Sequence, residues 1–435
     1  MTGWLFRMFT AWIAVAAGGL ACAHMARGPA CRDVLHLRKV VILMRHGVRA
    51  PTHSPQKLSR WSDRKWPSWS APPGDLTRNG FWLAEMMAVG IRQYYGSRGL
   101  AVPVGCAGHR DLYVYADNMQ RTIATGQAVL KGFFGDCHVV PSHFAIGKDP
   151  LFHAIKMNAC RVDKGKARRK MMRDLQRMTD MRSFQTHMED MRRILCSSED
   201  TKQAICALRR PTRIVVGEHV ALHGGLHVAS AVGEAFLMEY ADGKPLKDVG
   251  WGHLRSVHAV NRMLYLHNVY SAITRQESYV AAHGATPLMR AINNVLMSGQ
   301  LTEGRHAIPQ AYRRAKMVFL IGHDVNIAHV AGMLRLNWAL TGQPDRTPPD
   351  MGLAFYLYRN NSGREWVGVR IFYQTLASMR AASLHKGDAN PLSEPVVIKG
   401  CDSGPRRDLC TVKRFERIVS RRLVSSCSVQ RSWLE

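Results

Sequence analysis

Apolar runs alternate along the chain with stretches that have the spacing of helices. Runs of strand type cover residues 37–44, 111–117 and 316–322, and each ends abruptly at polar residues. Continuous apolar runs of this length are typical of strands that are buried on both faces. Because strands alternate with helices, we predict a three-layer α/β fold, in which helices cover both faces of one sheet.

Several helices and two further strands follow from the same patterns. Asp75 and Thr77 are suited to cap a helix that begins near residue 78. The predicted helices and strands of this part of the fold are helices 78–95, 118–134, 324–336, 374–382 and 412–423, and antiparallel strands 353–358 and 366–372.

The middle of the chain has a different character, because strand signals fade after residue 150 and charged helical stretches replace them. Helices are expected at 164–195, 225–241, 254–283 and 287–297. The 435 residues suit two domains. We therefore predict a mostly helical second domain, residues 150–258, inserted into an α/β domain formed by residues 32–149 and 259–435.

The amino-terminal segment has the features of an export signal. One positive charge lies in residues 1–7, an apolar stretch covers residues 8–21, and small residues follow at Ala21-Cys22-Ala23. This pattern predicts a signal peptide at residues 1–23, and a periplasmic or secreted protein. A membrane anchor is the alternative, although the apolar stretch is too short to span a bilayer comfortably.

The ten cysteines also fit export, because disulfides persist in oxidising compartments. Cys22 would leave with the signal peptide. Spacing suggests the pairs Cys196–Cys206, Cys401–Cys410 and Cys106–Cys137. A long-range bridge between Cys160 and Cys427 would then leave Cys31 over, although the sequence alone does not fix this connectivity.

The formal net charge of +28 points to an anionic partner. A nucleic acid is disfavoured, because the basic residues are spread along the chain and neither a zinc-finger spacing nor an RNP motif occurs. A small anionic molecule fits as well. We interpret the basic run at residues 164–170 as a solvated helix face, with a substrate or partner contact as the alternative.

Residues that could bind or attack a phosphate group follow each of the three apolar runs. Arg45 and Arg49 flank His46 after the first run. Such a cluster repels itself unless it holds an anion, and the arginine fork suits phosphate. An imidazole among phosphate-binding arginines is placed to attack phosphorus, although a basic loop with a solvated histidine is the alternative.

The second and third runs end in the same way. Arg121 falls one turn into the helix that follows residues 111–117, and helix amino termini attract anions. A solvated arginine is the alternative there. His323 and Asp324 follow the third run. Neither an HExxH nor a Walker A motif occurs, so we expect neither a metal nor a cofactor.

The stretch Arg45-His46-Gly47-Val48-Arg49-Ala50-Pro51-Thr52, joined to the distant His323-Asp324, resembles the histidine acid phosphatases (branch 2). The resemblance is to secreted bacterial phytases and glucose-1-phosphatases. It implies an α/β domain assembled from both ends of the chain, an inserted helical domain, and a substrate cleft between them. The supporting stretches are residues 116–122, 322–328 and 340–349.

The resemblance also implies a role for each residue. His46 would be the nucleophile and form a phosphohistidine, and Asp324 would protonate the leaving oxygen, which low pH favours. The neighbouring arginines should lower the pKa of His46 and keep it nucleophilic in acid. They would also replace a metal ion. The residues expected to bind the substrate are Arg45, Arg49, Thr52, Arg121 and His323.

The residues that would indicate the substrate match two different groups of enzymes. Gly47, Val48 and Thr52 resemble the phytase pattern, whereas His53 stands where phytases often have lysine, and residues 118–121 resemble glucose-1-phosphatases. We expect a monomeric acid phosphatase that acts on phytate (myo-inositol hexakisphosphate), with no nucleic-acid or membrane partner. The alternatives are a glucose-1-phosphatase or broad phosphatase, a polyanion-binding protein without turnover, and a phosphomutase-like transferase.

Overall fold

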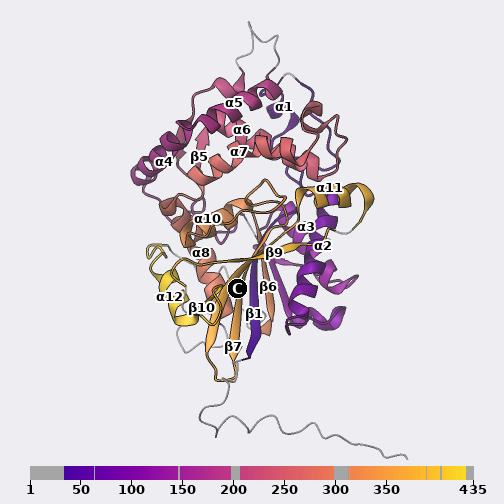
Figure 1. Cartoon of the computed structure of the whole chain (residues 1–435), viewed down its shortest axis with the longest axis vertical. Coiled ribbons are helices and arrows are strands. Elements are labelled where there is room, and N and C mark those ends of the chain that lie inside the picture. The colour runs from indigo at the N-terminus through magenta and orange to yellow at the C-terminus, as the bar shows by residue number, and fades with distance from the viewer. Residues whose placement is uncertain are drawn as a thin grey trace, which may run out of the picture.

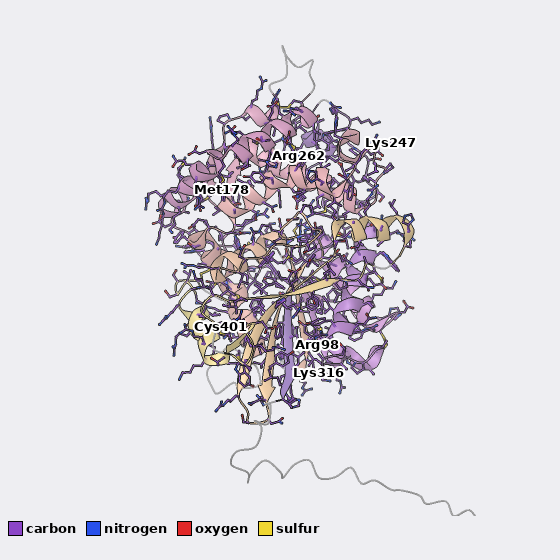
Figure 2. All side chains as sticks on the ribbon, viewed as in Figure 1. Arg98, Met178, Lys247, Arg262, Lys316 and Cys401 are labelled. Carbon is purple, nitrogen blue, oxygen red and sulfur yellow. A yellow bond between two sulfur atoms is a disulfide. The ribbon has the colours of Figure 1, made fainter. Side chains whose placement is uncertain are left out.

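The computed structural model describes residues 34–427, except 63, 146, 197–205, 298–311, 313, 388 and 402–403. The predicted signal peptide, Cys22 and Cys31 lie outside the described residues. A helical body, formed by α4 to α7, lies above a body built on the large sheet (Figure 1). The labelled Arg262 and Lys247 belong to the helical body, whereas Lys316 and Cys401 belong to the sheet body (Figure 2).

The large sheet has eight strands in the order β10-β8-β7-β1-β6-β2-β3, with β9 paired to β8. Strand β1 (Leu35–Arg45) runs parallel to β6 (Met317–Gly322), which runs parallel to β2 (Leu112–Ala116). The carboxyl ends of these three strands therefore meet at one edge of the sheet. The other strands are β3 (Ser142–His143), β7 (Gly352–Asn360), β8 (Glu365–Tyr373), β9 (Leu392–Val396) and β10 (Leu409–Thr411).

Helices cover both faces of this sheet, as the sequence predicts. Val40, Ile42 and Met44 of β1 pack on the side of α2 (Arg78–Gly96) and α3 (Gln120–Phe134). Val41 and Leu43 point to the opposite side, toward α8 (Ser278–Leu296) and α10 (Asp324–Leu334). Figure 1 shows these helix pairs on opposite sides of the sheet. Helix α12 (Val412–Ser420) also packs on the α8 side.

The helical body has its own hydrophobic cluster, which includes Met171, Met191, Phe236 and Leu264. The predicted domain boundaries stay predictions, although residues of α7 beyond position 258 belong to this cluster. Its elements are α4 (Lys164–Thr179), α5 (Arg182–Leu195), α6 (Gly225–Ala241), α7 (Val257–Thr274), and the hairpin β4 (Arg213–Val216) with β5 (Val220–His223). The remaining elements are α1 (Pro55–Leu58), α11 (Leu376–His385), η1 (Cys106–Arg110), η2 (Ala207–Arg209) and η3 (Val249–Gly252).

The predicted helices 254–283 and 287–297 have the wrong boundary. The break lies between α7 and α8, where the Glu277 carboxylate accepts hydrogen bonds from the backbone N–H groups of Tyr279 and Val280. Pro287 lies inside α8 rather than at its start. A helix start is set by satisfied N–H groups, so the cap at Glu277 outweighs the local proline signal.

All four predicted disulfides are present. Cys160–Cys427 spans 267 residues and joins the segment before α4 to the segment after α12. Among the described residues, we find no helix with the length and apolar character that crossing a membrane requires.

Candidate active site

His46 lies at the end of β1 and is almost fully buried. Its backbone N–H donates to the Gly322 carbonyl of β6 at 2.9 Å, which fixes the loop against the neighbouring strand. Its ring Nδ1 lies 2.9 Å from the Gly47 carbonyl. Because only a protonated Nδ1 donates to that carbonyl, the neutral ring carries its lone pair on Nε2, the atom that can attack phosphorus.

The pKa of His46 is held well below its ordinary value. Burial is the largest cause, and the charges of Arg121, Arg45 and His323 add to it. This confirms the expected direction, although burial exceeds the arginines as the cause. The His46 ring is therefore neutral even in moderate acid, and its Nε2 lone pair is free for chemistry.

Glycine is required after His46, because the loop lies very close to neighbouring atoms. A Cβ at Gly47 would approach the Asp350 side chain and the Gly80 carbonyl to 2.8 Å. The backbone N–H of Gly47 also donates to Thr125 Oγ1 of α3 at 3.0 Å. These contacts hold the turn that presents His46.

Arg45 and Arg49 are joined by a carboxylate that sequence reasoning missed. Glu234 of α6 accepts from Arg45 Nη2 at 2.5 Å and from Arg49 Nη2 at 2.8 Å. Arg45 also donates to Asp345 at 2.9 Å and to the Thr347 carbonyl. Burial opposes ionisation of Glu234, but Arg49 and Arg45 outweigh burial and lower its pKa to about 2.

Arg121 completes the group of arginines, as the sequence predicts. It donates to the Gly74 carbonyl at 3.4 Å and is half-buried. Burial, followed by the charge of Arg49, lowers its pKa to about 10. The Nε atoms of Arg45, Arg49 and Arg121 are buried without a hydrogen-bond partner among the described residues. Three unsatisfied cationic donors indicate a site for an anion.

Thr52 lies at the exposed rim of this site, next to Gly74, and its hydroxyl oxygen is 3.5 Å from His53 Nδ1. The structure therefore brings Thr52 near Arg121, but not into the buried group around His46. Its contact with a substrate stays a prediction.

His323 follows β6 and lies beside His46, with ring centroids 5.4 Å apart. Its Nε2 lies 2.6 Å from a carboxylate oxygen of Asp117, and His153 Nε2 lies 2.8 Å from the same oxygen. Burial lowers the pKa of His323 to about 4, although the hydrogen bond to Asp117 opposes this shift. Asp117 thus orients the ring from the end of β2.

Asp324 begins α10, and Arg275, the residue after α7, forms an ion pair with its carboxylate. His267 Nε2 lies 4.0 Å from the same oxygen. Burial opposes ionisation of Asp324, but Arg275 and Arg45 outweigh burial and hold its pKa well below the usual range. Without substrate, Asp324 is therefore a carboxylate. A bound phosphate would add negative charge nearby and raise this pKa toward the value that a proton donor needs.

Two groups of side chains have the spacing of metal ligands among the described residues. They are Asp117, His153 and His323, and Glu234, His267 and Asp324. In both groups the carboxylates already bind histidine or arginine, so the local charge is largely balanced without a cation.

Four partners of the predicted residues were missed from sequence: Asp117, Glu234, Arg275 and Asp345. Asp117 and Asp345 lie within stretches that carried the family resemblance. Glu234 and Arg275 lie on or beside helices of the helical body, and no strand end marks them. Only the packing of that body against the sheet brings them to the site.

Comparison with known proteins identifies the family to which the sequence is related. The model of the histidine phosphatase superfamily (branch 2) matches residues 36–374. The chain is 30% identical over 410 residues to phytase AppA of Escherichia coli K12, and the match covers 91% of this chain and 94% of the relative. It is 26% identical over 395 residues to a glucose-1-phosphatase of Providencia rettgeri, covering 89% and 92%.

A solved structure of Hafnia alvei phytase in complex with myo-inositol hexakis sulphate superposes with a TM-score of 0.81. The two sequences are 32% identical, and the match covers 93% of this chain and all of the phytase chain.

Proposed function

The chain belongs to the histidine phosphatase superfamily (branch 2), and on this premise we propose that the site around His46 hydrolyses phosphate monoesters through a phosphohistidine. The observation that carries the proposal is the neutral His46, with its lone pair on Nε2, among the unsatisfied donors of Arg45, Arg49 and Arg121. The charges of Arg121, Arg45 and Arg49 all act on His46, so we expect a phosphate bound by these arginines to lie near its ring.

In the proposed first step, Nε2 of His46 bonds to phosphorus as the bond to the ester oxygen breaks. The arginines stabilise the charge on the phosphoryl oxygens, which is the main demand in phosphoryl transfer. Asp324, protonated once phosphate lies beside it, gives its proton to the leaving oxygen. Water then attacks the phosphohistidine while the Asp324 carboxylate takes the water's proton. The second step restores the neutral histidine and the protonated aspartate.

We propose phytate as the preferred substrate. Support comes from the phytases among the relatives and from the net charge of +28, which favours a highly anionic substrate. The glucose-1-phosphatase of Providencia rettgeri supports the alternative of a sugar monophosphate. A polyanion-binding protein without turnover is disfavoured by the presence of both His46 and Asp324.

We further propose that the protein works alone, in the periplasm or outside the cell, on a small phosphate ester. The four disulfides support an oxidising compartment.

The test is phosphate release from phytate, glucose 1-phosphate and 4-nitrophenyl phosphate between about pH 3 and 6. We expect turnover with phytate favoured, and its loss in His46→Ala. Rapid quenching should trap labelled phosphate on the wild-type protein only. His109→Ala, an exposed histidine of η1, is the matched control and should keep full activity.

Equal activity in His46→Ala would contradict the phosphohistidine mechanism. Turnover of glucose 1-phosphate alone would favour the sugar-phosphate alternative. Asp324→Asn should lose most activity on phytate and less on 4-nitrophenyl phosphate, because an aryl leaving group needs less protonation.

A further inference from the structure

His267 of α7 lies beside Asp324, although the proposed reaction gives this histidine no role. The ring is almost fully buried, and its Nε2 atom lies 4.0 Å from a carboxylate oxygen of Asp324. This Nε2 atom is buried without a hydrogen-bond partner among the described residues. Hydrogen bonds of a reaction are often long before the substrate binds, so an unsatisfied nitrogen here indicates a contact that forms during the reaction.

The other ring nitrogen of His267 is bound by a serine. Nδ1 lies 3.1 Å from Oγ of Ser230, a buried residue of α6. A hydroxyl group can donate to Nδ1 or accept from it, so this contact by itself allows both tautomers of the neutral ring.

The charges around His267 decide between the two tautomers. A ring nitrogen of His267 and one carboxylate oxygen each of Glu234 and Asp324 lie within 4.8 Å of one another. Although burial opposes ionisation, neighbouring arginines hold the pKa of both carboxylates below the ordinary value. A lone pair on Nε2 would be repelled by these negative charges, whereas an N–H group there is attracted to them. The neutral ring therefore carries its proton on Nε2, and Ser230 donates to Nδ1.

The residue after His267 fixes α7 against a loop of the phosphate site. The side-chain amide of Asn268 donates to the Pro344 carbonyl at 3.1 Å. The next residue of that loop, Asp345, accepts from Arg45 at 2.9 Å. The ring of His267 is therefore held at a defined place relative to the arginines that we propose for phosphate.

The contacts of Asp324 leave one acceptor position for His267. One carboxylate oxygen accepts from the backbone N–H of Val325 at 2.8 Å, and the other forms the ion pair with Arg275. A carboxylate oxygen has two lone pairs, so the oxygen bound by Arg275 can accept a second hydrogen bond. A movement of about 1 Å would bring Nε2 of His267 within hydrogen-bond distance of this oxygen.

We propose that His267 is a positioning residue for Asp324, which donates from Nε2–H to the carboxylate and, with Arg275, orients it toward the leaving oxygen. Ser230 supports this role because it holds the ring in the tautomer with the proton on Nε2. The inference rests on the proposed phosphatase function. In this scheme the imidazole of His267 transfers no proton itself.

Asparagine and glutamine at position 267 separate the two ring nitrogens. By its length, asparagine places its amide near the position of Nδ1, whereas glutamine reaches the position of Nε2. We expect His267→Asn to lower kcat for phytate about tenfold, as for a lost charge-assisted hydrogen bond, and His267→Gln to keep most of the activity. KM should change little in both variants, because the arginines that we propose for phosphate remain.

The loss in His267→Asn should depend on the leaving group. We expect a change of less than about twofold for 4-nitrophenyl phosphate, because an aryl leaving group needs less protonation. His283→Asn is the matched control and should leave the ratio of the two activities unchanged. His283 is a buried histidine of α8 whose Nδ1 lies 2.7 Å from the Tyr279 carbonyl.

A double-mutant cycle tests whether His267 acts through Asp324. His267→Asn should have no further effect on phytate turnover in an Asp324→Asn background. A tenfold loss in both backgrounds, or equal losses with the two substrates, would show a role in packing alone and overturn the proposal. Circular dichroism and the thermal midpoint verify that the variants are folded.

Nitrogen-15 NMR of the neutral His267 ring provides a measurement that does not need turnover. We expect the proton on Nε2, and a proton on Nδ1 would overturn the proposal. Failure of the proposed function is a different result, because it would appear as a wild-type protein that releases no phosphate from any ester.

Discussion

Glu234 binds Arg45 and Arg49, the two arginines that we propose for phosphate, so we expect Glu234 to compete with phosphate. Without its charge, Arg45 and Arg49 repel each other in a largely buried place. We expect Glu234→Gln to lower the free energy of unfolding by about 2 kcal/mol, less than the 3–5 kcal/mol typical of a broken buried pair, because glutamine still accepts one hydrogen bond. We also expect the variant to bind inorganic phosphate more tightly than the wild type.

Urea unfolding with and without phosphate measures both effects. Glu85→Gln is the control, because Glu85 forms a looser pair with the half-exposed Lys131 at 3.7 Å, and such pairs contribute about 0–1 kcal/mol. If phosphate stabilised Glu234→Gln no more than the wild type, competition by Glu234 would be excluded.

Asp350 is a buried acid whose contribution to stability we expect to depend on pH. It is fully buried, neither of its carboxylate oxygens has a hydrogen-bond partner among the described residues, and burial raises its pKa well above the ordinary value. The folded state therefore keeps a proton that the unfolded state releases near pH 4. The contribution of Asp350 to the free energy of unfolding is therefore expected to fall as pH rises above about 4, by up to about 1.4 kcal/mol per pH unit.

Asp350→Asn removes this titration, and asparagine tolerates the φ of 62° found there. Urea unfolding at several pH values should show the wild type gaining stability relative to the variant as pH falls from 7 to 4. Parallel pH profiles would mean that Asp350 does not keep its proton in the folded protein.

For individual residues, sequence reasoning identified the side chains that the structure brings together around His46, but not the partners that hold them. Arg45, His46, Arg121, His323 and Asp324 follow buried strands, and parallel strands bring their ends together. Glu234 and Arg275 lie on or beside helices, whose orientation against the sheet is a tertiary property without a sequence period. Sequence reasoning did not predict that Asp324 is ionised, because it did not identify Arg275, which forms an ion pair with Asp324.

The first turn of α2 packs closely against the loop that carries His46. Thr77 donates to the Val48 carbonyl, and a Cβ at Gly80 would lie 2.0 Å from the same oxygen. We expect Gly80→Ala to move this loop, reduce activity at least tenfold, and lower the free energy of unfolding by about 1–3 kcal/mol. Gly96→Ala is the matched control in the same helix, because its Cβ would meet no atom within 4 Å.

Enzyme assays and urea unfolding of both variants provide the measurement. Gly96→Ala should be neutral or stabilise by up to about 1 kcal/mol. Wild-type activity in Gly80→Ala would show that the loop adapts without disturbing His46.

The elements themselves were predicted well where a periodic signal exists. The apolar face of α2 and the strands β7 and β8 occur close to the expected places. The two faces of β1 could not be separated from sequence, because Val40 to Met44 are all apolar and fully buried. The boundary between α7 and α8 was not predicted correctly, because only the Glu277 side chain marks it in the sequence.

The whole molecule is tied by a disulfide between distant parts of the chain. Chain-entropy arguments give about 6 kcal/mol for a loop as long as that of Cys160–Cys427, and about 3 kcal/mol for the short Cys196–Cys206 loop. We expect the double serine variant of Cys160–Cys427 to lose more stability than that of Cys196–Cys206. Hydrogen bonds from Arg290 to the Cys427 and Val424 carbonyls should keep part of the final segment in place.

Unfolding of the two double variants in urea, under oxidising conditions, checks this order. A larger loss in the Cys196–Cys206 variant would show that local strain or contacts, rather than loop length, decide the contribution of each bridge.

The central place of β1 also determines when the protein becomes active during its synthesis. His46 is among the first described residues to leave the ribosome, but the carbonyls that hold the loop, those of Gly322 and Met351, are made several hundred residues later. His323 and Asp324 arrive equally late. A nascent chain that ends before β6 therefore carries His46 without these hydrogen bonds, and we expect it to be inactive toward phosphate esters until β6 and β7 are made.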